Sequence, residues 1–301
     1  MSQPSTPIIL SPAEFADTGQ WRLIIYISHS GMTALLRHAS DPQRPIVRMF
    51  DATWPLPDSP AGGASLLKRI ENTVYDHPGV LDDYATDIII ESPHATWVPT
   101  AVIESAAGED PEQQVFHSLF PGVEGDICTD RLGDITALYS LSPGLEAFLG
   151  RTLPGARMRL HLGVLAEGVP AMLGDRPAVA AAFRDNGFDL LAFGTDGRML
   201  SASARSAAND PCADILKAMQ VLGLAEGSAD IILCGNHPSR EGCRIMLEAR
   251  GLAPKTLDIP GTAAPTSLPT AAALLAFRHR PAASTGPEPA ADATGNDHNQ
   301  I

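Results

Sequence analysis

The sequence predicts an α/β protein of two similar lobes, in which mixed sheets are flanked by helices. The chain has 301 residues, and at roughly 150 residues per domain this length leaves room for two domains or one bilobed domain. The elements predicted in each half follow the same order, β-β-β-α-β. Gly-containing turns separate neighbouring strand-like runs in both halves.

The first half begins with strand-like runs at residues 22–28, 32–39 and 45–52, which favour an antiparallel meander. An amphipathic helix is predicted within residues 65–79, where Pro and Gly end the pattern. The run at 87–92 is almost entirely apolar, as is typical of a buried strand. The face of the helix expected to be buried comprises Leu66, Leu67, Ile70 and Val74.

The middle of the chain alternates between predicted helices and strands. The pattern favours helices at residues 109–122 and 143–155, and strands at 133–142 and 156–168.

The second half repeats the order of the first. Residues 179–206 contain three strand-like runs joined by Asp185-Asn186-Gly187 and Thr195-Asp196-Gly197, which are strong tight-turn signals. A helix follows from Asp210, a predicted N-cap, with Pro at its first position. The remaining predicted elements are a buried strand at 229–236, a helix at 238–251 with Cys243, Met246 and Leu247 inward, and a closing helix at 267–280.

We accordingly divide the chain into an N-terminal arm (1–20), a first lobe (21–150), a second lobe (151–280) and a tail (281–301). The tail has too little apolar content to offset its ordering entropy, so it is expected to be disordered.

Composition excludes several classes of function. The net charge of −14 would repel a phosphate backbone, so no nucleic-acid partner is expected. The four cysteines have no zinc-site spacing and are predicted to be core residues in a reducing compartment. No signal peptide and no membrane span is recognised, and a cytoplasmic location is expected.

A resemblance enters at residues 87–103. Glu91-Ser92-Pro93, Thr96 and Val98-Pro99 resemble the ESPxxTxVP signature of an uncharacterised bacterial family similar in fold to actin-like ATPases. Duplicated lobes of this element order also characterise the actin and hexokinase superfamily. The resemblance covers about residues 21–278 and implies the actin-like, ribonuclease H-like two-lobed fold. It implies no activity, because none is established for that family.

Active members of that superfamily hold nucleotide between two phosphate hairpins and a Gly-rich adenosine loop. The matching positions here are Ser28, Ser30 and Gly31 in the first turn, Asp185 and Gly187 in the second, and Gly235 and Asn236 after the later buried strand. The first turn, Ser-His-Ser-Gly, lacks the carboxylate that Mg²⁺ prefers. The second turn is too short to wrap a phosphate. The position of the adenosine loop keeps one Gly, where two or three would let a purine approach the backbone.

The other groups of polar residues give little indication of a catalytic or metal site. Adjacent residues on a strand face opposite ways, so Ser28 and His29 cannot form a nucleophile–base pair directly. Glu91 ends a buried strand, where acids in α/β enzymes often act, but the sequence reveals no metal or base partner for it. The histidines show no metal-binding spacing.

These observations predict a pseudo-ATPase: an actin-like fold without catalytic residues, metal or cofactor, serving as a binding or assembly module. The partner is an unidentified protein or a second copy of the chain. Two alternatives stay open: an ATPase or small-molecule kinase, and a cleft that binds nucleotide without hydrolysing it.

Overall fold

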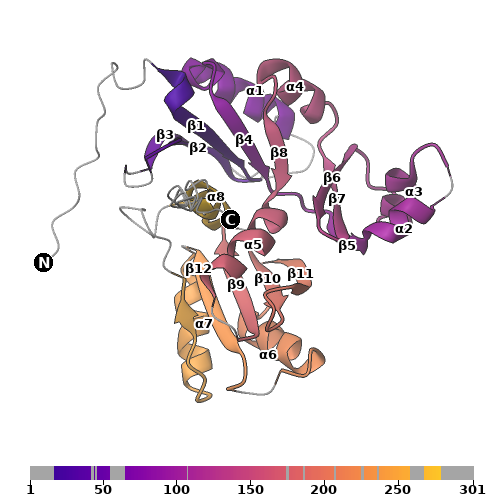
Figure 1. Ribbon diagram of the computed structural model, residues 1–301, viewed down its shortest axis with the longest axis vertical. Coiled ribbons are helices and arrows are strands. Elements are labelled where there is room, and N and C mark those ends of the chain that lie inside the picture. The colour runs from indigo at the N-terminus through magenta and orange to yellow at the C-terminus, as the bar shows by residue number, and fades with distance from the viewer. Residues whose placement is uncertain are drawn as a thin grey trace, which may run out of the picture.

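The computed structural model describes residues 17–41, 44, 46–54, 65–106, 108–173, 176–185, 187–206, 208–224, 227–235, 237–257 and 268–278. The predicted tail lies outside these residues, as does most of the predicted N-terminal arm. The described chain forms two five-stranded sheets and one three-stranded sheet (Figure 1). Single 3-10 turns occur at Thr18–Gln20, Pro78–Leu81 and Pro170–Met172.

The first sheet has the order β3-β2-β1-β4-β8. Its first three strands form the predicted meander, and β4 and β8 add parallel to β1. Because side chains alternate along β1, Leu23 and Ile25 pack against the helices on the outer face, whereas Ile24 faces the other lobe. The elements are β1 (Trp21–Ile27), β2 (Gly31–His38), β3 (Val47–Thr53), β4 (Ala85–Ile90), β8 (Arg157–Leu160), α1 (Leu66–Asp76) and α4 (Leu145–Thr152).

The second sheet has the equivalent order, β11-β10-β9-β12-β13, with the same pattern of antiparallel and parallel neighbours. Asp210 caps α6 as predicted, because its carboxylate accepts hydrogen bonds from the backbone N–H groups of Cys212 and Ala213. The elements are β9 (Ala178–Arg184), β10 (Gly187–Phe193), β11 (Met199–Ser206), β12 (Asp230–Gly235), β13 (Lys255–Thr256), α6 (Pro211–Val221) and α7 (Ser239–Glu248).

Two helices, α5 (His161–Gly168) and α8 (Thr270–Arg278), lie between the two large sheets (Figure 1). Their buried residues form one apolar cluster with the inner faces of both sheets, including Ile24, Leu191 and Leu274. The molecule is therefore layered as helices, sheet, helices, sheet and helices.

A third, small sheet was not predicted. It has the order β5-β7-β6 and, with two helices, projects to one side of the first lobe (Figure 1). The hydroxyl of Ser92, in the signature segment, donates to the carbonyl of Ser140 and so ties the entry of β5 to β7. The elements are β5 (Ala95–Pro99), β6 (Asp126–Leu132), β7 (Ile135–Leu141), α2 (Thr100–Ser105) and α3 (Pro111–Leu119).

Three expectations need correction. The strand predicted at 156–168 ends at Leu160 and continues as α5, because a short run buried on all sides has no periodicity that separates strand from helix. Since β8 pairs with β4, the first sheet extends past residue 150, where we ended the first lobe. Met246 is 45% exposed, whereas Cys243 and Leu247, one turn apart, are buried.

Candidate functional site

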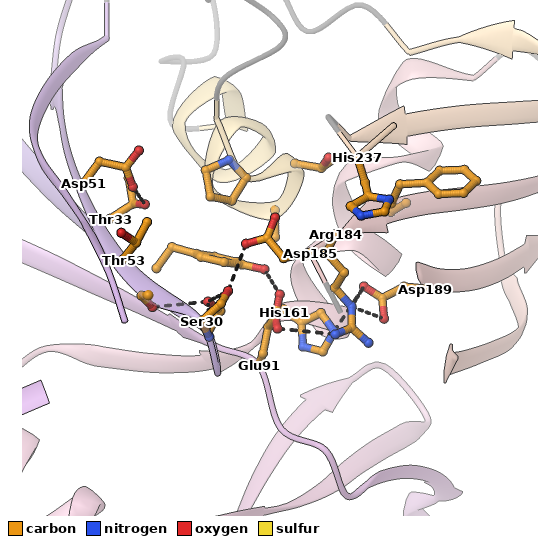
Figure 2. Close-up of a pocket in the computed structure, with 18 of the residues that line it drawn as sticks. Ser30, Thr33, Asp51, Thr53, Glu91, His161, Arg184, Asp185, Asp189 and His237 are labelled. Carbon is orange, nitrogen blue, oxygen red and sulfur yellow. Dashed lines mark hydrogen bonds and ion pairs between the residues drawn. The ribbon is translucent and has the colours of Figure 1, made fainter. Parts of the chain in front are cut away.

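A cavity of about 290 Å³ lies between the two lobes, where the first sheet faces the second (Figure 2). It is bounded by the β1–β2 and β9–β10 turns, the end of β4, the start of α5 and the start of α8. Its polar lining residues are Tyr26, Ser28, Ser30, Thr33, Asp51, Thr53, Glu91, His161, Arg184, Asp185, Asp189, His237 and Thr270.

The β1–β2 turn uses most of its polar groups internally. The Ser28 hydroxyl donates to the Gly31 carbonyl at 3.2 Å and accepts from the Ser30 backbone N–H at 3.3 Å. His29 is exposed and is not among the residues that line the cavity. The Ser28 hydroxyl, which was expected to face a phosphate, therefore stabilises the turn itself.

The two hairpin turns contact each other across the cleft. The Ser30 hydroxyl donates to Asp185 Oδ2 at 2.9 Å (Figure 2). The second turn is as short as predicted, because Arg184 pairs directly with Gly187. Asp185 is exposed, and the described residues provide it with no ion-pair partner.

A buried cluster of charged groups lies deeper in the cavity (Figure 2). Arg184 lies 3.3 Å from Glu91 of the first lobe and 3.1 Å from Asp189 of the second. His161 Nε2 lies 3.2 Å from Asp189 Oδ2, and the Tyr26 hydroxyl donates to Glu91. Glu91 therefore has two partners that the sequence did not reveal.

The pKa values in this cluster follow from burial and from charged neighbours. Burial acts to lower the pKa of His161, but the negative charges of Asp189 and Glu91 raise it by more than burial lowers it. The pKa of His161 is therefore raised above its ordinary value. Burial acts to raise the pKa of Asp189, but His161 and Arg184 lower it overall. Burial and the adjacent Glu91 raise the pKa of Tyr26 well above its ordinary value, which keeps its hydroxyl protonated.

The three candidate glycines lie where backbone segments approach closely. A Cβ at Gly31 would collide with the Ala52 carbonyl on β3, and one at Gly187 with the Arg205 carbonyl on β11. Gly235 has φ +92°, and its Cβ would collide with the Phe183 carbonyl on β9. Strand packing alone therefore explains all three, without a ligand. Asn236 lies outside the described residues.

The first turn contains no acid, but folding brings four carboxylates from other segments to the same cavity: Asp51, Glu91, Asp185 and Asp189. Asp51 accepts from Thr33 at 2.7 Å and pairs with Arg48 at 3.1 Å. Asp51 and Asp189 lie within the strands β3 and β10. No local feature of the sequence therefore marked them as site residues.

No three His, Cys, Asp or Glu side chains of the described residues are arranged to hold a metal ion. All four cysteines are buried and free of disulfides, in keeping with the predicted core positions. No helix within the described ranges is long and apolar enough to cross a membrane.

Comparison with solved structures defines the class of the protein. A protein of unknown function with an actin-like ATPase fold from Bacteroides thetaiotaomicron superposes with a TM-score of 0.67, at 18% identity over 83% of this chain and 95% of that chain. The PilM–PilN type IV pilus biogenesis complex superposes with a TM-score of 0.50, at 11% identity over 86% and 98% of the two chains.

The chain therefore has the actin-like ATPase fold, with two sheet-containing lobes, as the resemblance implied. At these identities the likeness shows the fold alone. No family model and no curated protein sequence matches the chain.

Proposed function

We propose that the protein is a non-catalytic member of the actin-like fold, a pseudo-ATPase that serves as a binding or assembly module. One observation carries the proposal. Arg184 is the single Arg or Lys among the described residues that line the interlobe cavity, and it is paired with Glu91 and Asp189. A triphosphate would therefore meet several carboxylates and no cation available to it.

The contacts between the lobes support a fixed relative position rather than a cleft that opens and closes. Two buried ion pairs, Glu91–Arg184 and His161–Asp189, join the first lobe and α5 to the second sheet. Separating them would leave charges unpaired in a desolvated site, which is costly. A rigid bilobed body is suited to presenting a surface to a partner.

The partner we propose is a protein. One structure of similar fold is the PilM–PilN type IV pilus biogenesis complex, in which two proteins associate. Assembly with a second copy of this chain is the alternative. The matching strand order of the two large sheets leads us to infer that the lobes arose by internal duplication, with their boundary within or near α5. We place the protein in the bacterial cytoplasm.

A nucleotide-dependent ATPase or small-molecule kinase is the second candidate. It is favoured by the placement of Asp51 and Asp185 beside the hydroxyls of Ser30 and Thr53 in the cavity (Figure 2). Carboxylates of this kind hold Mg²⁺ with its phosphates, often through water.

Thermal melting of the full chain with and without Mg-ATP, together with a phosphate-release assay, separates the candidates. A ligand at 100 times its Kd adds about 2.7 kcal/mol of stability. We expect no shift in Tm and no phosphate release at millimolar Mg-ATP. A clear shift without release would instead support a nucleotide-binding cleft, and a shift with turnover would support the ATPase or kinase.

A further inference from the structure

A second cavity, of about 420 Å³, lies away from the interlobe site, at the junction of the small sheet with α3 and α4. We call it the junction groove. Its lining combines carboxylates, a phenol, a thiol and apolar side chains, and belongs to no site described above. Its lining includes Asp110, Glu112, Ile127, Cys128, Tyr139, Glu146 and Met158.

Tyr139 is the most unusual of these residues. It is only 1% exposed, and it lines the junction groove from β7. None of the hydrogen bonds found in the described part of the chain involves its hydroxyl. Among the described residues, the fully buried polar atoms without a partner do not include this hydroxyl, so it is open to the groove, where a ligand can bond to it. Burial is the main cause that raises its pKa, so the group is a neutral phenol that can accept a hydrogen bond.

The acids of the groove are also uncompensated. Among the ion pairs of the described residues, none involves Asp110, Glu112 or Glu146. Burial, then the nearby charges of Glu146 and Asp126, raise the pKa of the Cys128 thiol to about 12. The groove therefore has a negative potential that disfavours a further anion and favours a cation.

The shape of the groove selects the kind of cation. Within the described residues, no three acidic, His or Cys side chains converge to hold a metal ion. Ile127 and Met158 supply apolar surface beside the carboxylates. This combination suits a cationic head on an alkyl chain, because the head pairs with the acids while the chain contacts apolar atoms.

We propose that the junction groove binds an organic ammonium or guanidinium group, with Tyr139 accepting a hydrogen bond from its N–H and Glu146 and Glu112 supplying the countercharge. The group belongs either to a lysine or arginine side chain of a protein or to a free polyamine. The site is independent of the interlobe cavity, so it stands whether or not that cavity binds nucleotide.

The test is two-dimensional NMR of the isotopically labelled full chain titrated with n-butylammonium, n-butylguanidinium or, as a neutral control of similar shape, 1-butanol. We expect the two cations to produce saturable shifts at Ile127, Cys128 and Glu146, and butanol to produce none. Equal shifts with butanol, or no saturable shift at the groove with either cation, would overturn the proposal.

Variants then assign the contacts. Tyr139→Phe should weaken binding of the better cation roughly tenfold, the effect of losing a hydrogen bond to a charged group. Glu146→Gln should weaken it by a similar factor. Glu124→Gln changes the net charge equally at an exposed position outside the groove lining, and it should leave affinity within about twofold. Equal losses in Glu124→Gln and Glu146→Gln would mean that only overall charge is being sensed, which contradicts the proposal.

The source of the group is decided by two further titrants, spermidine and a terminally blocked peptide with a single lysine. Tighter binding of the peptide assigns the groove to a protein side chain, and tighter binding of spermidine assigns it to a polyamine. If neither binds at the groove while simple cations do, the site does not serve either source and the proposal fails.

Discussion

The imidazole of His161 lies in a buried cluster where its neighbours decide its charge. Asp189 and Glu91 face it as carboxylates and Arg184 as a cation, and the neutral phenol of Tyr26 donates a hydrogen bond to Glu91. Burial alone would keep the ring neutral, but the pair with Asp189 outweighs that cost. The pKa of His161 is therefore raised, at a position that the sequence marks only as part of an apolar run.

Replacing His161 by Gln should make stability depend differently on pH. Because the folded-state pKa of His161 is raised above its unfolded value, its charge contributes stability that is fully present below about pH 6.5 and lost as pH rises through the folded pKa. We expect His161→Gln to lose roughly 3–5 kcal/mol near pH 6, since it leaves Asp189 without one of its cations.

The measurement is urea unfolding of both proteins between about pH 6 and pH 9. The difference in the free energy of unfolding should shrink toward high pH. The lowered pKa of Asp189 acts in a separate range, because its contribution is lost only as pH falls through a value below 3.8. A difference that stays constant or grows with pH would show that His161 is neutral in the folded protein.

Local sequence patterns predicted the strands, turns and helices around the cleft better than they predicted the residues of the site. The meanders, α1 and α6 with its cap at Asp210 lie where the periodicity and turn residues predicted them. The glycines at the strand ends were interpreted as the counterparts of two phosphate hairpins and an adenosine loop, yet each lies against a neighbouring strand's carbonyl. Sequence alone cannot separate these roles, since both require the absence of a side chain.

Alanine at the strand-end glycines tests the packing role. Gly187→Ala and Gly235→Ala should each cost at least about 2 kcal/mol, because the new Cβ meets fixed backbone. The matched control is Gly242→Ala in α7, where a Cβ meets nothing within 4 Å, and which should gain about 0.5–1 kcal/mol of helix stability. Chemical unfolding monitored by circular dichroism gives all three values. Neutral effects at positions 187 and 235 would count against packing as the reason for these glycines.

At the scale of the molecule, the two lobes share a core rather than meeting at a wet interface. The inner faces of both sheets and the helices α5 and α8 bury one continuous apolar cluster. The polar cavity lies at the edge of this apolar cluster. The ion pairs across the cavity hold the two lobes in a fixed relative position. Such an arrangement makes the two-lobed body rigid, and this rigidity supports the proposed role as a binding module.

A double-mutant cycle measures the link between lobes. We expect Arg184→Met to cost about 3–5 kcal/mol, because it leaves Glu91 and Asp189 buried without that cation. Glu91→Gln combined with it should reveal a coupling of about 1–3 kcal/mol. The control is the exposed pair Arg198–Asp134, 2.6 Å apart with side chains 64% and 73% exposed, whose coupling should be below about 1 kcal/mol. Similar coupling in both pairs would refute a special role for the buried one.

The amino-acid sequence by itself determined the fold class, the β-β-β-α-β order within each large sheet and the hairpin turns, because periodicity, capping and turn chemistry are local properties. Only the tertiary structure decided what lies between the lobes. Tyr26, Glu91, His161, Arg184 and Asp189 come from four segments, and no spacing along the chain predicts that they meet. The small sheet and its junction groove were equally hidden, since pairing of β5, β6 and β7 depends on contacts between distant strands.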